Sequence, residues 1–461
     1  MNHLGVELSV KNVPELDSGF IPLYQYNKAF LSTASKPVGI AVERADGEMA
    51  SVQTFIHGTD AMREADRYYI RRLVKTLLWM KGGFRVYVSD DRELYHYLCE
   101  CFSADGCQAF DYHYFPKIYE RPFELVYTEK LPAAVDRPKP AGGHLEGCRI
   151  GFDAGGSDRK VSAVVDGETV YSEEVVWFPK ITEDPDYHYN GIISALKSAA
   201  AHLPRVDAVG VSSAGIYINN RTMDASLFLK VPRDLFDAKV KDIYIRAITD
   251  TFGDVPFNVF NDGDVTALAG AMSLGDTNVL GIAMGTSEAV GYVDDNGCIT
   301  GWLNELAFVP VDANPKAMQD EWSLDIGCGV KYFSQDAVIK LSPAAGIALE
   351  ESLSPAEKLK VVQGLMEKDD PRAAAVYRSI GCYLAHTLAL YHELYHFRHV
   401  LLLGRVMSGK GGDLIISTCK AVLADEYAGL AAQINLALPD EKFRRVGQSA
   451  AAASLPELKE S

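Results

Sequence analysis

The stretch RIGFDAGGS, residues 149–157, decides the fold class of this chain. Its first part is a short apolar run that ends in the carboxylate of Asp153, and its last part is a turn, Gly155-Gly156-Ser157. A second apolar run follows at residues 161–165. Apolar runs bounded by glycine-rich turns are typical of paired strands. We therefore predict two strands joined by a tight turn, with a carboxylate at the end of the first strand.

The same arrangement occurs again in the second half of the chain. An apolar run at residues 279–283 leads into Gly285-Thr286-Ser287, and another strand pattern follows at residues 290–293. A mixture of helical and strand patterns follows each copy. Because the unit occurs twice, we expect two related α/β lobes that face each other.

A break separates these units from the N-terminal part of the chain. Residues 135–143 contain two prolines and two glycines, which interrupt any regular pattern. The preceding residues carry no glycine-rich phosphate loop and predict a small α/β module. Its expected elements are a hairpin (38–57), a helix (63–79), a strand (84–88), a second helix (93–102) and an aromatic strand that serves as packing surface (110–115).

The composition indicates an acidic globular protein. Lys and Arg number 45 against 62 Asp and Glu, which gives a net charge of −17. This excess of acids opposes nonspecific binding to a phosphate backbone. The start of the chain does not resemble a secretory signal, and no window reaches the roughly 20 apolar residues of a membrane span. With eight scattered cysteines that suit reduced thiols, we expect a cytoplasmic protein without nucleic-acid or membrane partners.

The two glycine-containing turns suggest phosphate binding. Glycines allow phosphate oxygens to approach backbone N–H donors closely. Asp153 lies where a carboxylate could hold Mg²⁺ through water, since Mg²⁺ prefers oxygen ligands and keeps its waters. The turn Gly285-Thr286-Ser287 adds two hydroxyl groups. When each glycine-containing turn is considered alone, the alternative interpretation is an ordinary hairpin turn.

A third segment, Asn261-Asp262, follows a strand pattern at residues 258–260 and precedes a helix expected from Val265. A carboxylate there could accept the proton of a sugar hydroxyl as its oxygen attacks a γ-phosphate. Helix capping is the alternative, because Asp and Asn are favoured before a helix and Asp264 could cap Val265.

Taken together, these segments resemble the ROK family of sugar kinases and related proteins over residues 146–456. Residues 150–157 are similar to the family's first phosphate loop. Residues 261–270 resemble the family segment whose aspartate is the catalytic base, which points to Asp262. Further similarities lie at the second phosphate loop (Gly285-Thr286-Ser287), the Glu-x-Gly-His segment (304–308), the adenosine-side loop (401–406) and the closing helix (447–453).

The resemblance implies an α/β, two-lobed, actin-like (ribonuclease H-like) kinase fold. It also implies phosphorylation of a hydroxyl group on a sugar or sugar derivative, with ATP and Mg²⁺ as cofactors and Asp262 as general base. The sugar-binding residues would be Asn261, Asn304 and Glu305. The residues on the nucleotide side would be Asp153, which also holds Mg²⁺ through water, and Gly155, Gly156, Ser157, Gly285, Thr286, Ser287 and Gly404.

Three parts are expected in a chain of 461 residues. Residues 1–145 would form an N-terminal accessory module, residues 146–264 the first lobe, and residues 265–444 the second lobe. A C-terminal helix near residues 445–456 is expected to pack back on the first lobe.

Several positions depart from the family pattern. Glu288 follows the second turn where the family is glycine-rich, and Phe308 replaces the histidine that contacts both sugar and zinc. Of the zinc-binding cysteines only Cys328 remains, and one thiolate cannot hold a structural zinc, so we expect no zinc site. Gln335 stands where a sugar-binding glutamate is usual. The alternative function is therefore a catalytically inactive ROK-fold protein that binds a sugar or nucleotide or acts as a regulator.

Two further alternatives remain. A repressor of the same family would need a basic winged-helix module, whereas residues 1–145 predict a hairpin plus α/β elements. The segment at residues 392–396, His-Glu-Leu-Tyr-His, matches a zinc-protease pattern, but such short patterns recur by chance and a third ligand is required. The sequence leaves the sugar, the hydroxyl and the oligomeric state open, with a homodimer as one option.

Overall fold

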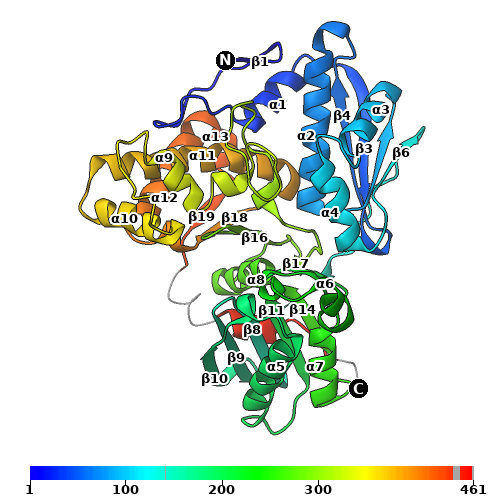
Figure 1. Cartoon of the computed structure of the whole chain (residues 1–461), viewed down its shortest axis with the longest axis vertical. Coiled ribbons are helices and arrows are strands. Elements are labelled where there is room, and N and C mark those ends of the chain that lie inside the picture. The colour runs from blue at the N-terminus through cyan, green and yellow to red at the C-terminus, as the bar shows by residue number, and fades with distance from the viewer. Residues whose placement is uncertain (141, 440–446, 459–461) are drawn as a thin grey trace. The chain divides into compact units, whose positions relative to one another are not determined.

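The computed structural model describes residues 1–140, 142–439 and 447–458 of the chain (Figure 1). Contacts divide the chain into two compact units, each of mixed α/β structure. Unit one comprises Met1–Arg137, Ile282–Val290 and Trp302–Leu438. Unit two comprises Pro138–Gly281, Gly291–Gly301 and Pro439–Ser461. The expected boundaries at residues 145, 264 and 444 stay predictions.

The core of unit two is a five-stranded sheet in the order β10-β9-β8-β11-β14. β9 runs antiparallel to β8 and β10, whereas β8, β11 and β14 run parallel to one another. In this register Asp153 lies opposite Ser212, and Ser213 lies opposite Asn261, so three strands end at the same edge. The strands are β8 (Cys148–Ala154), β9 (Asp158–Val165), β10 (Glu168–Val176), β11 (Ala208–Ser213) and β14 (Phe257–Asn261), and the predicted strand pair at 149–165 is confirmed.

Helices cover both faces of this sheet (Figure 1). On one face, Ile150, Phe152, Val209 and Val211 form a buried core with residues of α5 (Pro185–Ala200) and α7 (Ile243–Phe252). The other face carries α8 (Asp262–Leu274) and α15 (Gln448–Ala453). Shorter elements of unit two are β12 (Ile216–Ile218), β13 (Arg221–Asp224) and α6 (Arg233–Leu235).

Two glycines let α15 lie directly on the sheet. A Cβ atom at Gly151 would overlap the carbonyl oxygen of Ser449, and one at Gly210 would overlap that of Ala452. The strands β8 and β11 therefore contact the backbone of α15 without intervening side chains. This is the helix expected near residues 445–456, whose first two residues lie outside the described part of the chain.

The N-terminal part of unit one is built on a four-stranded sheet in the order β4-β3-β5-β6, beside which Figure 1 shows α2 and α4. Its elements confirm the predicted hairpin, strand and two helices. The strands are β3 (Lys36–Glu43), β4 (Met49–Ile56), β5 (Arg85–Ser89) and β6 (Glu124–Thr128), after the short pair β1 (Asn2–His3) and β2 (Val6–Glu7). The helices are α1 (Leu23–Leu31), α2 (Arg63–Lys81), α3 (Arg92–Cys101) and α4 (Ala109–Tyr119).

The prediction of a strand at residues 110–115 is wrong, because this run lies in helix α4. Phe110 and Tyr114 are one helical turn apart, and both stack on Trp79 of α2, with ring centroids 6.3 and 5.4 Å away. The aromatic density marks one face of a helix packed on α2. The sequence alone does not separate the two structures here, because aromatic side chains are also enriched in strands.

A six-stranded sheet has the order β19-β18-β15-β16-β17-β7, and it contains the second predicted strand–turn–strand unit. The strands of this sheet are β7 (Lys139–Pro140), β15 (Val279–Met284), β16 (Glu288–Val293), β17 (Cys298–Ile299), β18 (His399–Leu403) and β19 (Asn435–Ala437).

None of the helices that the structure describes is both long and apolar enough to cross a membrane. The remaining helices are α9 (Gln335–Leu341), α10 (Pro355–Glu367), α11 (Pro371–Tyr395), α12 (Lys410–Glu426) and α13 (Ala428–Ala431).

The variant Gly210→Ala tests the close packing of α15. The added Cβ must displace this helix, because its nearest neighbours are backbone atoms. We expect the free energy of unfolding, measured in urea, to fall by about 1–3 kcal/mol, the usual cost of overpacking. The control is Gly364→Ala in α10, where the added Cβ meets no described atom within 4 Å apart from its own chain neighbours and nearby helix backbone. Alanine there should raise stability by about 0.5–1 kcal/mol. Equal stability of Gly210→Ala and wild type would contradict the packing.

Candidate functional site

The strand ends of unit two bring several predicted site residues together. The hydroxyl of Ser212 donates to Asp153 Oδ1 at 2.9 Å. The side-chain amide of Gln448 donates to Ser212 Oγ and to the carbonyl oxygen of Asp262, both at 2.9 Å. α15 therefore links the end of β11 to the start of α8. Neither Ser212 nor Gln448 is predicted from the sequence, because a serine and a glutamine carry no motif of their own.

Asn261 caps helix α8. Its Oδ1 accepts from the backbone N–H of Gly263 at 2.7 Å, and its Nδ2 donates to the carbonyl oxygen of Gly215 at 2.7 Å. The expected helix start at Val265, with Asp264 as cap, is wrong, since the helix begins at Asp262. The side chain of Asn261 satisfies the orphan donor that helix capping requires. The carboxylate of Asp262 thus stands in the first turn of the helix without being its cap.

Burial changes the acidity of the two carboxyl groups at these strand ends. It raises the pKa of Asp262, while the N–H of Gly263 and the charge of Lys180 oppose that rise. Burial also raises the pKa of Asp153 to about 7, and the negative charge of Asp262 adds to the effect. Both side chains are half-buried, and two neighbouring carboxylates that repel each other are oxygen ligands that a divalent cation would stabilise. The residues present therefore fit Mg²⁺.

The first glycine turn is held by the residues that follow β10. The backbone N–H of Trp177 donates to the carbonyl oxygen of Ser157 at 3.1 Å, and its indole Nε1 donates to that of Gly155 at 2.8 Å. Three residues later, Lys180 lies over the turn, since a Cβ at Gly156 would be 2.7 Å from Lys180 Nζ. This turn combines glycine backbone with an ammonium group, the two kinds of donor that bind phosphate.

Sequence reasoning missed Lys180. It lies outside the glycine motif and in no helical or strand pattern. Only the β9–β10 hairpin, which folds residues 177–180 back onto the turn, brings it there.

The second turn lies in unit one, between β15 and β16. The hydroxyl-bearing Thr286 and Ser287 are exposed, and Gly285 accepts a hydrogen bond from the N–H of Gln335 at 2.9 Å. Gly404 has a φ of +92°, and a Cβ there would overlap the carbonyl oxygen of Met284. Glycine is therefore required at residue 404 by its conformation and by its contact with the end of β15.

Glu288, which departs from the family pattern, points into the interior of unit one. Its side chain is 4% exposed, and neither carboxyl oxygen has a hydrogen-bond partner among the described residues. Gly329 lies against it, because a Cβ at that glycine would overlap Glu288 Oε2. Burial, reinforced by the charge of Glu305, raises the pKa of Glu288 well above its ordinary value. The neutral form is favoured, so this acid does not place a negative charge beside the exposed turn.

Asn304 and Glu305 are the first two residues of a loop at residues 304–308 in unit one. Their backbone N–H groups donate to the carbonyl oxygens of Met80 and Trp79, both at 3.0 Å. The Asn304 side chain accepts from the hydroxyl of Tyr395 at 2.8 Å. Asn304 also has a φ of +55°, a strained value for a residue other than glycine.

The histidines of the zinc-protease pattern at residues 392–396 lie on both sides of a helix end. His392 lies in α11, whereas His396 follows the helix end with a φ of +53°, and the described residues contain no group of three metal-binding side chains.

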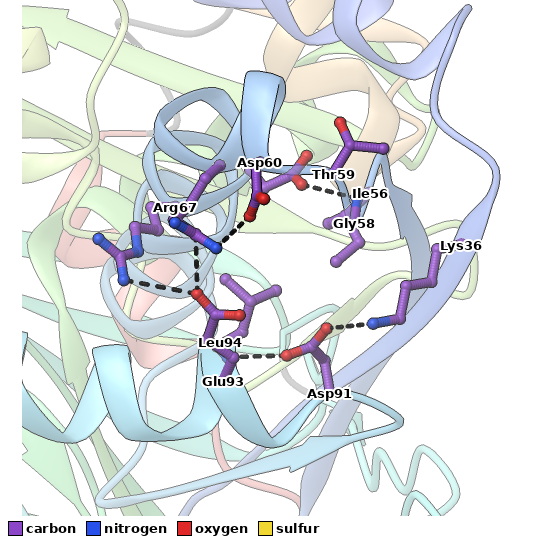
Figure 2. A pocket seen from close by; sticks show the side chains of 11 residues that line it. Lys36, Ile56, Gly58, Thr59, Asp60, Arg67, Asp91, Glu93 and Leu94 are labelled. Atoms are coloured by element: carbon purple, nitrogen blue, oxygen red, sulfur yellow. Dashed lines mark hydrogen bonds and ion pairs between the residues drawn. The ribbon is translucent and has the colours of Figure 1, made fainter.

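A pocket beside α2 and α3 is lined by charged side chains, but these pair with one another (Figure 2). Lys36 contacts Asp91 at 2.6 Å, and Arg63 contacts Glu93 at 3.0 Å.

The chain has the ROK fold. It is similar in structure to a ROK hexokinase from Thermus thermophilus, with a TM-score of 0.51 and 17% identity, over 66% of this chain and 96% of that one. It is also similar to a ROK family transcriptional regulator, a homologue of the E. coli MLC protein, with a TM-score of 0.51, 15% identity, and coverage of 68% and 78%. The sequence matches no protein-family model and no curated protein. The predicted actin-like α/β fold class is confirmed, and the fold alone does not distinguish a kinase from a regulator.

Glu288→Gln tests the buried neutral carboxyl. Because the folded pKa is raised above the ordinary 4.5, the wild type loses stability as the pH rises above that value. The loss is up to about 1.4 kcal/mol per pH unit while the folded group keeps its proton. Glutamine has nearly the same shape and cannot ionise. The stability of the variant relative to wild type should therefore increase from about pH 5 to about pH 8 in urea unfolding.

The matched control is Glu351→Gln, at an exposed position. It should leave the pH dependence of unfolding as in the wild type. Parallel pH profiles for Glu288→Gln and wild type would show that Glu288 is ionised in the folded protein.

Proposed function

We propose that this chain is an ATP-dependent kinase that phosphorylates a hydroxyl group of a sugar or sugar derivative. The observation that carries the proposal is the cluster at the strand ends of unit two. There Gln448 links Asp262 to the Ser212–Asp153 pair, and the charge of Lys180 acts on Asp262 from above the glycine turn. The occurrence of this fold in a ROK hexokinase supports the assignment.

Asp262 is the general base. It would accept the proton of the sugar hydroxyl as that oxygen attacks the γ-phosphate. Burial raises its pKa toward the working pH, where a general base is most effective. Asn261 supports this role by capping α8, which fixes the position of the next residue.

Backbone donors and Lys180 bind the phosphates of ATP in unit two. The donors are the N–H groups of Gly155, Gly156 and Ser157, and the ammonium of Lys180 lies beside Gly156. Asp153 would hold Mg²⁺ through water, and bound Mg²⁺ would neutralise charge on the phosphate oxygens. In unit one, the residues that we assign to nucleotide binding are Gly285, Thr286, Ser287 and Gly404.

The sugar is assigned to Asn261, Asn304 and Glu305. The side chains of both asparagines already have protein partners, Gly263 and Gly215 for Asn261 and Tyr395 for Asn304.

The second candidate function is a ROK-fold protein that binds a sugar or nucleotide without turnover. Its support is the similarity to a transcriptional regulator and the loss of a histidine at residue 308. Phe308 instead packs against Trp79 and Trp322, with ring centroids 4.7 and 4.6 Å away. A phenylalanine side chain offers no hydrogen-bonding group to a sugar.

The deciding experiment is an ADP-release assay over hexoses, amino sugars and their N-acetyl forms with Mg²⁺. Asp262→Asn should lower kcat at least about 100-fold, because it removes the proton acceptor. Asp295→Asn, the same change at an exposed turn, is the control and should turn over like wild type. If the protein binds ATP but releases no ADP with any of these sugars, the second candidate function is favoured. Wild-type turnover by Asp262→Asn would exclude this residue as the base.

Lys180→Met tests the phosphate contact. Loss of one charge-assisted contact should raise the KM for ATP about tenfold and leave the KM for the sugar unchanged. Lys180→Arg should retain part of the affinity, since it keeps the charge. Lys197→Met, at an exposed position of α5, is the matched control. An unchanged KM for ATP in Lys180→Met would remove Lys180 from the site.

A further inference from the structure

We propose that helix α2, from the N-terminal part of the chain, positions the loop that carries the assigned sugar-binding residues Asn304 and Glu305. The inference rests on the proposed function for the role of that loop, but its geometry stands apart from catalysis. It assigns Arg72 and Lys75 as positioning residues, and it gives the N-terminal part a role in substrate recognition.

The first contact is made by the carboxyl end of α2. The last carbonyl groups of a helix have no partner within the helix and need donors from elsewhere. Here the N–H groups of Asn304 and Glu305 donate to Met80 and Trp79, and the helix ends at Gly82 with a φ of +86°. The loop thereby supplies donors that the helix end requires. This places the backbone of both sugar-binding residues relative to α2.

The second contact is a buried ion-pair network one to two turns earlier in α2. Arg72 Nη1 lies 2.7 Å from Asp325 Oδ2, and Lys75 Nζ lies 3.2 Å from the same oxygen. Arg72 also donates to the carbonyl oxygen of Ile326 at 3.3 Å. The side chains of Arg72, Lys75 and Asp325 are 3%, 1% and 9% exposed. Burial would raise the pKa of Asp325, but the two cations hold it well below its usual range.

A second acid balances the network. Lys75 Nζ lies 3.1 Å from Asp111 Oδ2 in α4, and the indole of Trp79 donates to Asp111 Oδ1 at 2.7 Å. Two cations thus meet two carboxylates in the interior, which avoids an unpaired buried charge. The same tryptophan then contacts Phe308 of the loop.

Residues near Asp325 are tied to the loop by backbone hydrogen bonds. The N–H of Val311 donates to the carbonyl oxygen of Gly327 at 2.8 Å, and the N–H of Gly329 donates to that of Val309 at 3.0 Å. A shift of the segment at 325–329 would therefore move residues 309–311, which directly follow the loop. The helix end and the ion pairs thus hold the loop from two sides.

This arrangement favours a positioning role over a purely stabilising one. Buried ion pairs often stabilise a fold no better than apolar side chains do, but they require one geometry. The strained backbone of Asn304 persists only where its surroundings determine it. Loss of a contact that only binds the substrate raises the KM for that substrate and leaves kcat unchanged. The effect of weakening the contact should therefore appear in sugar binding.

The test uses the full-length protein with the double variant Arg72→Met/Asp325→Asn. The double change leaves no unpaired charge, because Lys75 keeps Asp111, and the amide oxygen at residue 325 can still accept from the N–H of Ile326. We expect the KM for the sugar to rise at least about tenfold, with kcat and the KM for ATP nearly unchanged. Amide hydrogens of residues 304–308 should exchange at least about tenfold faster than in wild type.

Two further variants complete the experiment. Arg72→Lys keeps the charge but loses the forked contact to Asp325 and Ile326, so its sugar KM should lie between those of wild type and the double variant. It also serves as the test if the double variant does not fold. The control is Arg85→Met/Glu124→Gln, a more exposed ion pair between β5 and β6 with a distance of 2.7 Å, in which Arg85 also contacts Glu43 at 2.8 Å. It should leave sugar KM and loop exchange as in wild type.

The outcomes separate the positioning role from the proposed function. Unchanged exchange at 304–308 together with an unchanged sugar KM would overturn the inference. If no sugar is turned over by wild type, the proposed kinase function fails, but faster exchange at 304–308 still supports positioning by α2. An equal rise in sugar KM in the control pair would show a general loss of packing and would also overturn the inference.

Discussion

The parallel register of β8, β11 and β14 is the constraint on which unit two depends. In a parallel sheet the carboxyl ends of neighbouring strands lie at one edge, where loops can present side chains to a ligand. Here the register sets Asp153 opposite Ser212 and Ser213 opposite Asn261. A shift of one residue in either pairing would turn these side chains to the other face of the sheet.

The same strands fix the helix that supports the site. Because Gly151 and Gly210 have no side chain, the backbone of α15 rests on β8 and β11. This contact brings Gln448 within hydrogen-bond distance of Ser212 and of the backbone of Asp262. The packing of α15 on these two strands therefore also sets the geometry of the site.

Electrostatics sets a condition on the proposed binding of ATP by this acidic chain. The net charge of −17 repels phosphate at long range, so attraction must come from local groups. Lys180 supplies one such group above the first turn, and burial favours the neutral form of Glu288. In unit one, the cations Arg72 and Lys75 are used inside the protein to hold Asp325. In both units these cations therefore act on groups that lie only a few ångströms away.

The local pattern of the sequence predicted most elements of the fold. Apolar runs, glycine turns and helical spacing depend on residues a few positions apart, and this is why the hairpin at 38–57, the helix at 63–79 and both strand–turn–strand units are confirmed. The order of the motifs also pointed to the ROK fold. The failures at α4 and at the start of α8 were local too. Aromatic residues suit strands as well as helices, and a run of Asn, Asp, Gly and Asp offers several capping positions.

Only the tertiary structure decided which side chains meet across long stretches of sequence. Arg72 and Asp325 are 253 positions apart, and Gln448 and Ser212 are 236 apart. Neither pair forms a motif, because each side chain is an ordinary polar residue until strand register and helix packing bring it to its partner. Lys180 follows the same rule on a shorter scale, since its place above Gly156 depends on how the β9–β10 hairpin folds back. Local chemistry determined the elements, and the packing of those elements determined the contacts at the site.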